Sequence, residues 1–135
     1  MVNDAIKRVG LSLLVHPNIS TLSALQRSFE IEGMESVVSR DMPTALLALS
    51  QHDFSVVVIY HRIVEEGDGW TLGALVRRLF PRAHIAVICN EKDVSALKAA
   101  INNRLDQVFD EKTDHEQIVA AILQKQARDG SRQVQ

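Results

Sequence analysis

The sequence lacks several features that would assign a function directly. It has a single cysteine, Cys89, which excludes an intramolecular disulfide and a metal site built from several cysteines. No apolar run approaches the ~18 residues that span a bilayer, and residues 1–10 contain no apolar segment of a signal peptide. We therefore expect a cytoplasmic protein that has no contact with a membrane.

An excess of basic charge is also missing. The 15 lysines and arginines stand against 17 aspartates and glutamates, which gives a formal net charge of -2. Proteins that bind a phosphate backbone usually carry net positive charge, so this chain is a poor candidate for a nucleic-acid-binding protein. The glycines at 67 and 69 have neither the GxGxxG nor the Walker spacing, and nucleotide binding therefore has no support.

What the sequence does contain is typical of one globular domain. Its 135 residues are 46% hydrophobic and 24% charged, as in ordinary folded proteins. After Lys125 the composition becomes polar and loses any apolar period. We expect a single domain over residues 1–125, followed by a linker or disordered tail over residues 126–135.

Five segments have the length and composition of β-strands, and they alternate with five segments of helical spacing. The predicted strands are residues 11–15, 36–39, 54–59, 85–89 and 107–109, and the predicted helices are residues 22–32, 44–51, 70–80, 93–103 and 113–123. The third and fourth strands are continuously apolar, which is typical of parallel strands that helices cover on both faces. The alternation predicts an α/β fold, a doubly wound five-stranded parallel sheet with helices on both faces.

This arrangement resembles the receiver domains of bacterial two-component response regulators. Local support comes from the apolar residues 54–59 before the third-strand loop, from Asp68-Gly69-Trp70 at the start of the third helix, and from the spacing between Cys89 and Glu111. The resemblance implies a flavodoxin-like, CheY-like sheet with strand order 2-1-3-4-5.

The resemblance also shows that the phosphorylation chemistry of active receivers is missing. Active receivers place two acids after the first strand and one at the end of the third, where they hold Mg²⁺ and accept a phosphoryl group. In this sequence the corresponding positions are His16, Pro17 and Tyr60, while Cys89 stands near the usual serine or threonine and Glu111 replaces the usual lysine. The resemblance therefore implies a degenerate phosphorylation pocket made of these five residues, which neither holds a metal nor has a catalytic role.

Elementary chemistry points in the same direction. A tyrosine phenol with a pKa of about 10 is neutral at physiological pH and offers no carboxylate nucleophile. Glu111 reverses the charge that would neutralise a phosphate. A register shift of one residue would place His61 at the acceptor position, but His61 is not an acid either.

We therefore expect a phosphorylation-independent pseudo-receiver that acts as a protein-interaction and dimerisation module, without enzymatic activity or cofactor. The resemblance implies the amino-terminal regulatory domain of a transcriptional response regulator, with a signalling protein as partner and with DNA bound only through an output domain outside this chain. The resemblance implies association through the fourth helix, fifth strand and fifth helix, or through the first and fifth helices. The interface residues that we expect here are Leu97, Lys98, Ile101, Gln117, Ala121 and Gln124.

One alternative uses the crevice beyond the carboxyl ends of the strands, where ligands lie in open α/β sheets. His16, His61, Cys89 and Glu111 offer side chains that transition metals accept. The alternative function is thus a flavodoxin-like sensor of a small molecule or metal. Packed, hydrogen-bonded side chains are the simpler interpretation of the same residues.

Overall fold

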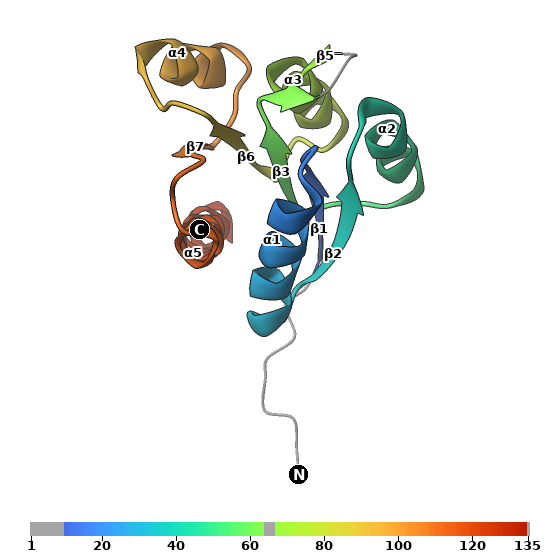
Figure 1. The fold of residues 1–135 in the computed structure, drawn as a ribbon. Helices are drawn as coiled ribbons and strands as arrows, with labels where there is room; N and C mark the ends of the chain where they lie inside the picture. The colour runs from blue at the N-terminus through green and yellow to red at the C-terminus, as the bar shows by residue number, and fades with distance from the viewer. Residues whose placement is uncertain (1–9, 64–66, 135) are drawn as a thin grey trace.

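The computed structural model describes residues 10–63 and 67–134 of the chain, and its main element is a five-stranded sheet of parallel strands. The strands are β1 (Leu11–Val15), β2 (Glu35–Ser39), β3 (Val56–Tyr60), β6 (His84–Cys89) and β7 (Gln107–Asp110). Their order across the sheet is β2-β1-β3-β6-β7 (Figure 1). Counted along the chain these are strands 2-1-3-4-5, so the predicted fold class and strand order are confirmed.

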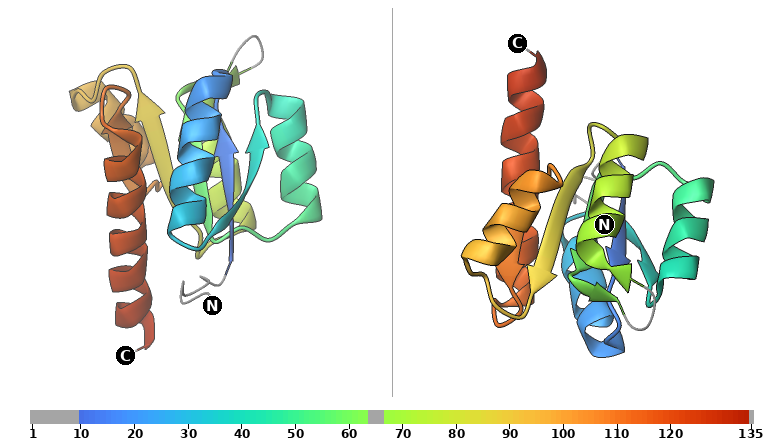
Figure 2. Two further views of the ribbon diagram at one scale, coloured as in Figure 1. Left: turned by 60° about the horizontal axis from the view of Figure 1, so that its bottom comes forward. Right: turned by 90° about the horizontal axis from the view of Figure 1, so that it is seen from above.

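Five helices connect these strands and cover both faces of the sheet. They are α1 (Ile19–Ile31), α2 (Met42–Gln51), α3 (Gly69–Leu79), α4 (Val94–Asn102) and α5 (His115–Val134). Buried side chains of α1 and α5 form one core cluster with the sheet, and those of α2 and α3 form another on the opposite face. A smaller cluster places α4 against the ends of β6 and β7. The two-sided covering is visible in Figures 1 and 2.

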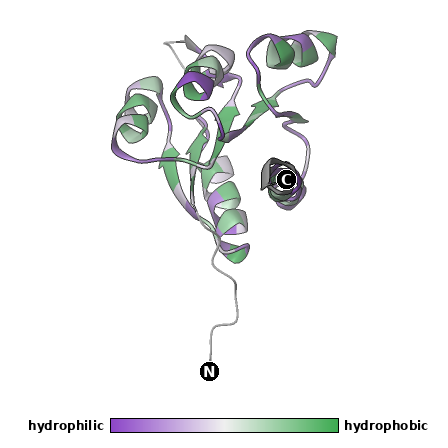
Figure 3. Ribbon diagram, turned by 180° about the vertical axis from the view of Figure 1, so that it is seen from behind, coloured by the Kyte–Doolittle hydropathy of each residue, from purple (hydrophilic) through white to green (hydrophobic). Residues whose placement is uncertain are grey.

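The apolar runs of the central strands follow from this covering. Successive residues of a strand point to opposite faces. Thus Val57 and Ile59 enter the cluster beneath α2 and α3, while Val56 and Val58 enter the cluster beneath α1 and α5. Figure 3 accordingly shows the strands as hydrophobic along most of their length. Burial on both faces is the reason that these runs do not alternate with polar residues.

Capping side chains start most helices just beyond the carboxyl ends of the strands. Asn18, Asp68 and Asp93 each accept a hydrogen bond from the backbone N–H three residues further on, which satisfies one free donor of α1, α3 and α4. The predicted capping box of the last helix puts its cap at Thr113, but α5 begins at His115. The cap position is therefore Asp114, whose backbone carbonyl accepts from Ile118 N at 3.0 Å.

Two short strands lie where a loop was predicted between the third strand and the third helix. β4 (Arg62–Ile63) and β5 (Gly67–Asp68) pair in antiparallel fashion. Strands of two residues are too short to produce any sequence period, so no pattern predicted them.

The last helix also differs from its prediction. It continues to Val134, so residues 126–134 are helical. Gln126 and Asp129 still lie beside His84 and Asp106, and the end of the helix extends past the sheet (Figure 2). Glutamine, alanine and arginine in this segment are good helix formers, and a helix that leaves the body of a domain needs no apolar stripe. None of the helices in residues 10–63 and 67–134 is both long and apolar enough to cross a membrane.

The fourth helix buries a different face from the one that its large apolar residues indicated. Val94, Leu97 and Ile101 are 67%, 43% and 74% exposed, whereas Ala96 and Ala100 are buried. The small side chains permit a close approach of α4 to the sheet, and the larger ones remain in solvent. An amphipathic pattern therefore identified the helix correctly but not the side that packs.

Candidate functional site

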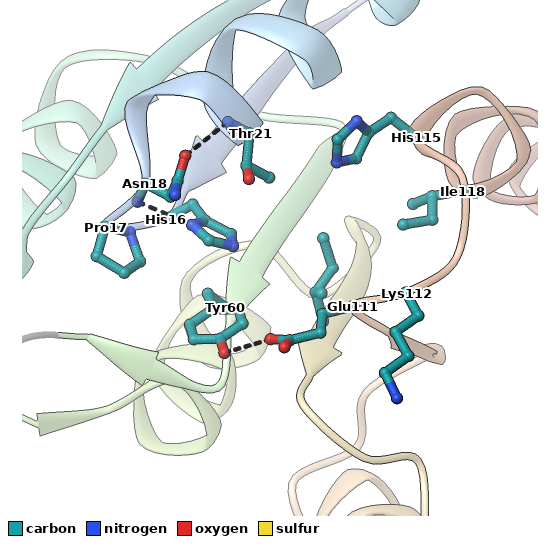
Figure 4. A pocket seen from close by; sticks show the side chains of 10 residues that line it. His16, Pro17, Asn18, Thr21, Tyr60, Glu111, Lys112, His115 and Ile118 are labelled. Atoms are coloured by element: carbon teal, nitrogen blue, oxygen red, sulfur yellow. Dashed lines mark hydrogen bonds between the residues drawn. The ribbon is translucent and has the colours of Figure 1, made fainter.

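Three strand ends bring the predicted pocket together at the carboxyl edge of the sheet. His16 follows β1, Tyr60 ends β3, and Glu111 follows β7. Their side chains line a pocket of about 440 Å³, shown in Figure 4. The other lining residues are Pro17, Asn18, Thr21, Ile88, Lys112, His115 and Ile118.

A hydrogen bond closes the pocket between β3 and β7. The phenol of Tyr60 donates to Glu111 Oε1 at 2.6 Å (Figure 4). The ring of His16 lies 4.3 Å from that of Tyr60, between centroids, and the ring of His61 lies 4.8 Å away. Tyr60 therefore contacts Glu111, His16 and His61, and its hydroxyl group donates a hydrogen bond to the carboxylate.

His16 is a neutral imidazole in this environment. It is only 8% exposed, and its Nδ1 accepts a hydrogen bond from Asn18 N at 3.0 Å. Because Nδ1 is the acceptor, the ring proton of the neutral form lies on Nε2. Burial lowers the pKa of His16 to about 4, although the nearby charge of Glu111 acts in the opposite direction. His16 thus brings no positive charge to the pocket at physiological pH.

Tyr60 keeps its proton even more firmly than a free phenol. Burial, together with the hydrogen bond to Glu111, raises the pKa of Tyr60 to about 12. Anionic phenolate is therefore scarce at neutral pH. A neutral phenol is a poor ligand for Mg²⁺ and a poor acceptor for a phosphoryl group.

Cys89 lies apart from the other predicted pocket residues. It is 2% exposed and packs with Ala96, Ala100 and Val108 beneath α4. Its thiol donates to the carbonyl of Glu91, with 3.2 Å between Sγ and the oxygen, and burial raises its pKa. Strand alternation explains the difference, because the preceding residue of β6 faces the pocket and Cys89 faces the other side. A packed, unreactive thiol is the interpretation that this environment favours.

Several lining residues were not predicted from the sequence. Asn18 caps α1, Thr21 lies in its first turn, and His115 begins α5. The signal that could have found them is positional, since the first turn of a helix that follows a parallel strand lies at the same sheet edge as the strand end.

The pocket lacks the ligands that a magnesium ion requires. Mg²⁺ prefers octahedral oxygen coordination with one or two carboxylates. Among the lining residues Glu111 is the one carboxylate, and it already accepts a hydrogen bond from Tyr60. The pocket is thus lined by the neutral rings of His16 and Tyr60 beside one acid, Glu111.

The predicted interface residues lie on two helices. Leu97, Lys98 and Ile101 are exposed on α4. On α5, Gln117 and Gln124 are exposed, and Ala121 is half-buried.

Solved structures of response regulators share this fold. A CheY-like receiver domain protein from Methanospirillum hungatei matches with a TM-score of 0.83 and 14% identity, over 93% of this chain and 99% of that chain. The response regulator DrrB, an OmpR/PhoB homologue from Thermotoga maritima, matches with a TM-score of 0.82 and 12% identity, over 90% of this chain and 54% of that chain. An orphan response regulator of H. pylori matches with a TM-score of 0.79 and 10% identity, over 90% of this chain and 99% of that chain.

Sequence comparison gives no such matches. No protein-family model and no curated protein matches the chain. The similarity therefore lies in the arrangement of strands and helices, and it agrees with the resemblance seen in the sequence. The chain has the fold of CheY-like response regulator receiver domains.

Proposed function

We propose that the protein is a pseudo-receiver, a signalling module that works through protein contacts and does not accept a phosphoryl group. The observation that carries this proposal is the hydrogen bond between Tyr60 and Glu111 beside the neutral ring of His16. These side chains occupy the strand ends where an active receiver needs carboxylates and a lysine. A phosphoryl group there would meet the negative carboxylate of Glu111.

Incubation with beryllium fluoride and Mg²⁺ tests the proposal directly. We expect no saturable binding by calorimetry and no change in the amide NMR signals of the pocket, because the carboxylate ligands are missing. An active receiver measured in parallel shows that the reagents are competent. Stoichiometric binding to this protein, or stoichiometric phosphorylation by acetyl phosphate, contradicts the proposal.

We further propose that the protein forms a homodimer through α4 and α5. The support is the exposure of Leu97 and Ile101, two large apolar side chains one helical turn apart beside exposed Lys98. In water such side chains favour burial against a matching surface. A receiver that receives no phosphoryl group requires contacts of this kind, with another copy or with a signalling protein, to shift between states.

Sedimentation velocity over a range of concentrations tests the dimer. We expect the wild-type protein to dimerise and the variant L97E/I101E to remain monomeric, because the charges cannot be buried in the contact. The matched control is Ile31→Glu, which changes an equally exposed apolar residue on α1 and leaves the dimer intact. A monomeric wild-type protein at high concentration, or equal effects of both variants, contradicts this interface.

The proposed biological setting is cytoplasmic regulation of transcription, with DNA bound by an output domain in the same polypeptide. This part rests on the similarity to an OmpR/PhoB homologue, of which the chain covers 54%, and on the projection of the last turns of α5 away from the domain. The reading frame after Gln135 tests it. A DNA-binding domain there supports the proposal, and a stop codon directly after Gln135 contradicts it.

A second candidate function is a small-molecule sensor. It is favoured by the size of the pocket, about 440 Å³, and by His16 Nε2, which faces the pocket in Figure 4. Native mass spectrometry of the purified protein tests it. A ligand mass that is present in the wild-type protein and absent from the His16→Phe variant supports the sensor, and an unliganded wild-type protein favours the interaction module.

A further inference from the structure

A second group of polar side chains lies at the opposite edge of the sheet from the His16–Tyr60 pocket. His84 is the first residue of β6, Asp106 immediately precedes β7, and Asp129 belongs to the C-terminal turns of α5. Each offers one nitrogen or oxygen, and these three atoms lie within 4.8 Å of one another. They line a polar cavity of about 250 Å³.

Hydrogen bonds determine which nitrogen of His84 faces this cluster. The amide nitrogen of Gln107 donates to the carbonyl of Ala121 at 3.5 Å, which turns Gln107 Oε1 toward His84. His84 Nε2 lies 2.6 Å from that oxygen and must therefore carry a proton. The remaining nitrogen, Nδ1, lies 4.0 Å from Asp106 Oδ2, beyond hydrogen-bond distance.

The result is a buried imidazole that points an electron pair at two carboxylates. His84 is only 4% exposed, and burial also lowers its pKa, which favours the neutral ring. A neutral imidazole nitrogen and two carboxylates are a ligand set that binds a cation, although Arg77 already donates to Asp106 Oδ2. Metal-binding histidines usually donate their other N–H to a neighbouring acceptor, as His84 does to Gln107.

Asp106 is held in place by its own hydrogen bonds. Arg77 Nη2 and Ile85 N donate to Oδ2, at 2.6 Å and 2.8 Å. Both bonds go to Oδ2, which is also the oxygen 4.0 Å from His84 Nδ1, so an ion at this site binds Oδ1 or replaces one of the two donors. The positive charges of Arg77 and of Lys125, which donates to the backbone carbonyl of Asp106, reduce the attraction for a cation. We therefore expect micromolar rather than nanomolar affinity.

We propose that His84 Nδ1 and one carboxylate oxygen each from Asp106 and Asp129 bind a divalent transition-metal ion, with Zn²⁺ as the best match. An imidazole with two carboxylates suits Zn²⁺ better than Mg²⁺ or Ca²⁺, which prefer oxygen ligands throughout. Water completes the coordination. Because Asp129 lies on α5 and the other ligands belong to the sheet edge, the ion fastens the C-terminal turns of α5 to the domain, a role that goes beyond the proposed interaction module.

Calorimetric titration of the full chain with ZnCl₂ tests the site. We expect one Zn²⁺ per chain in the wild-type protein and at least about tenfold weaker binding by Asp129→Asn and His84→Asn, since losing even an outer hydrogen-bond partner of a metal ligand costs that much. If His84→Asn does not fold, Asp129→Asn alone tests the site, because Asp129 is partly exposed and its substitution should not prevent folding. The matched control is Asp53→Asn, which removes an exposed carboxylate from the same edge of the sheet and leaves binding unchanged.

Thermal unfolding provides an independent readout. A ligand that binds the folded state raises its stability, so a given concentration of ZnCl₂ raises the Tm of the wild-type protein and of Asp53→Asn more than the Tm of Asp129→Asn. Excess MgCl₂ does not reduce the effect. The proposal is overturned if the wild-type protein shows no saturable binding, if Asp129→Asn binds as tightly as the wild-type protein, or if His16→Gln or Cys89→Ser abolishes the binding instead.

Discussion

The side chains of His16 and Tyr60 are both uncharged at neutral pH. The imidazole of His16 has its pKa lowered by burial, and the phenol of Tyr60 has its pKa raised by burial and by Glu111. Both shifts favour the neutral form, because a partly closed pocket solvates an ion less well than water does. The stability of the folded protein consequently depends on pH through His16.

We expect His16→Gln to reduce the loss of stability between pH 7 and pH 4.5. An unfolded histidine has a pKa of about 6.5 and folded His16 a pKa of about 4, so between these values the unfolded chain binds more protons. The contribution of His16 is complete above pH 6.5 and falls as the pH drops, by on the order of 2–3 kcal/mol. Urea unfolding at the two pH values measures the difference.

Exposed His52 is the control for this experiment. His52→Gln should retain the pH dependence of the wild-type protein. If His16→Gln also retains it in full, the neutral buried imidazole is not the origin of the effect.

Among the elements, the junction of β3 with α3 leaves no room for a side chain at Gly69. Gly69 begins α3, and its N–H donates to the carbonyl of His61 at 2.8 Å. A Cβ at this position would lie 2.2 Å from the carbonyl oxygen of Tyr60, which is backbone and cannot turn aside. The helix starts so close to the end of β3 because residue 69 has no side chain.

We expect Gly69→Ala to destabilise the protein by about 1–3 kcal/mol or more, the usual cost of overpacking a closed site. Gly73→Ala is the matched comparison on the same helix. Its Cβ would meet Leu105 Cδ2 at 2.9 Å, the end of a flexible side chain, and alanine also favours the helix by about 1 kcal/mol. Urea unfolding should therefore show a much smaller loss for Gly73→Ala, and equal losses contradict the steric argument.

Across the whole molecule, the two edges of the sheet are organised by different chemistry. Neutral rings gather at the carboxyl edge, whereas charged groups gather at the amino edge around Arg77. The guanidinium of Arg77 donates to the carbonyls of Arg104, Pro81 and Ala83, each at 2.8 Å, and to Asp106. It thereby joins α3 to the segments that enter β6 and β7.

We expect Arg77→Lys to destabilise the protein by about 2 kcal/mol. The ammonium group of lysine has only three N–H donors and cannot replace the four hydrogen bonds of the planar guanidinium. Arg78→Lys changes the neighbouring exposed arginine and should stay within about 0.5 kcal/mol of the wild-type protein. Chemical denaturation of both variants provides the comparison. Equal stability of the two variants shows that the bonds of Arg77 contribute nothing net.

Much of the architecture could be predicted from local patterns. Runs such as residues 54–59 indicated buried parallel strands, and the resemblance implied their order, which the structure confirms. Local patterns failed where a different constraint acted. Packing selected Ala96 and Ala100 rather than Leu97 for the buried side of α4, and strand alternation turned Cys89 away from the pocket.

The order of amino acids was sufficient to specify alternating buried strands and surface helices, because hydrophobic periodicity is a local property of the chain. It also placed His16 and Pro17 after the first predicted strand and Tyr60 after the third, and none of these residues is an acid. Contacts between residues that are far apart in the sequence could not be predicted from it. Tyr60 and Glu111 meet across 51 positions, and His84 approaches Asp129 from another element, because packing the helices on the sheet sets these distances. The hydrogen bond in the pocket and the proposed zinc site therefore depend on the tertiary structure, because each joins residues that are far apart in the sequence.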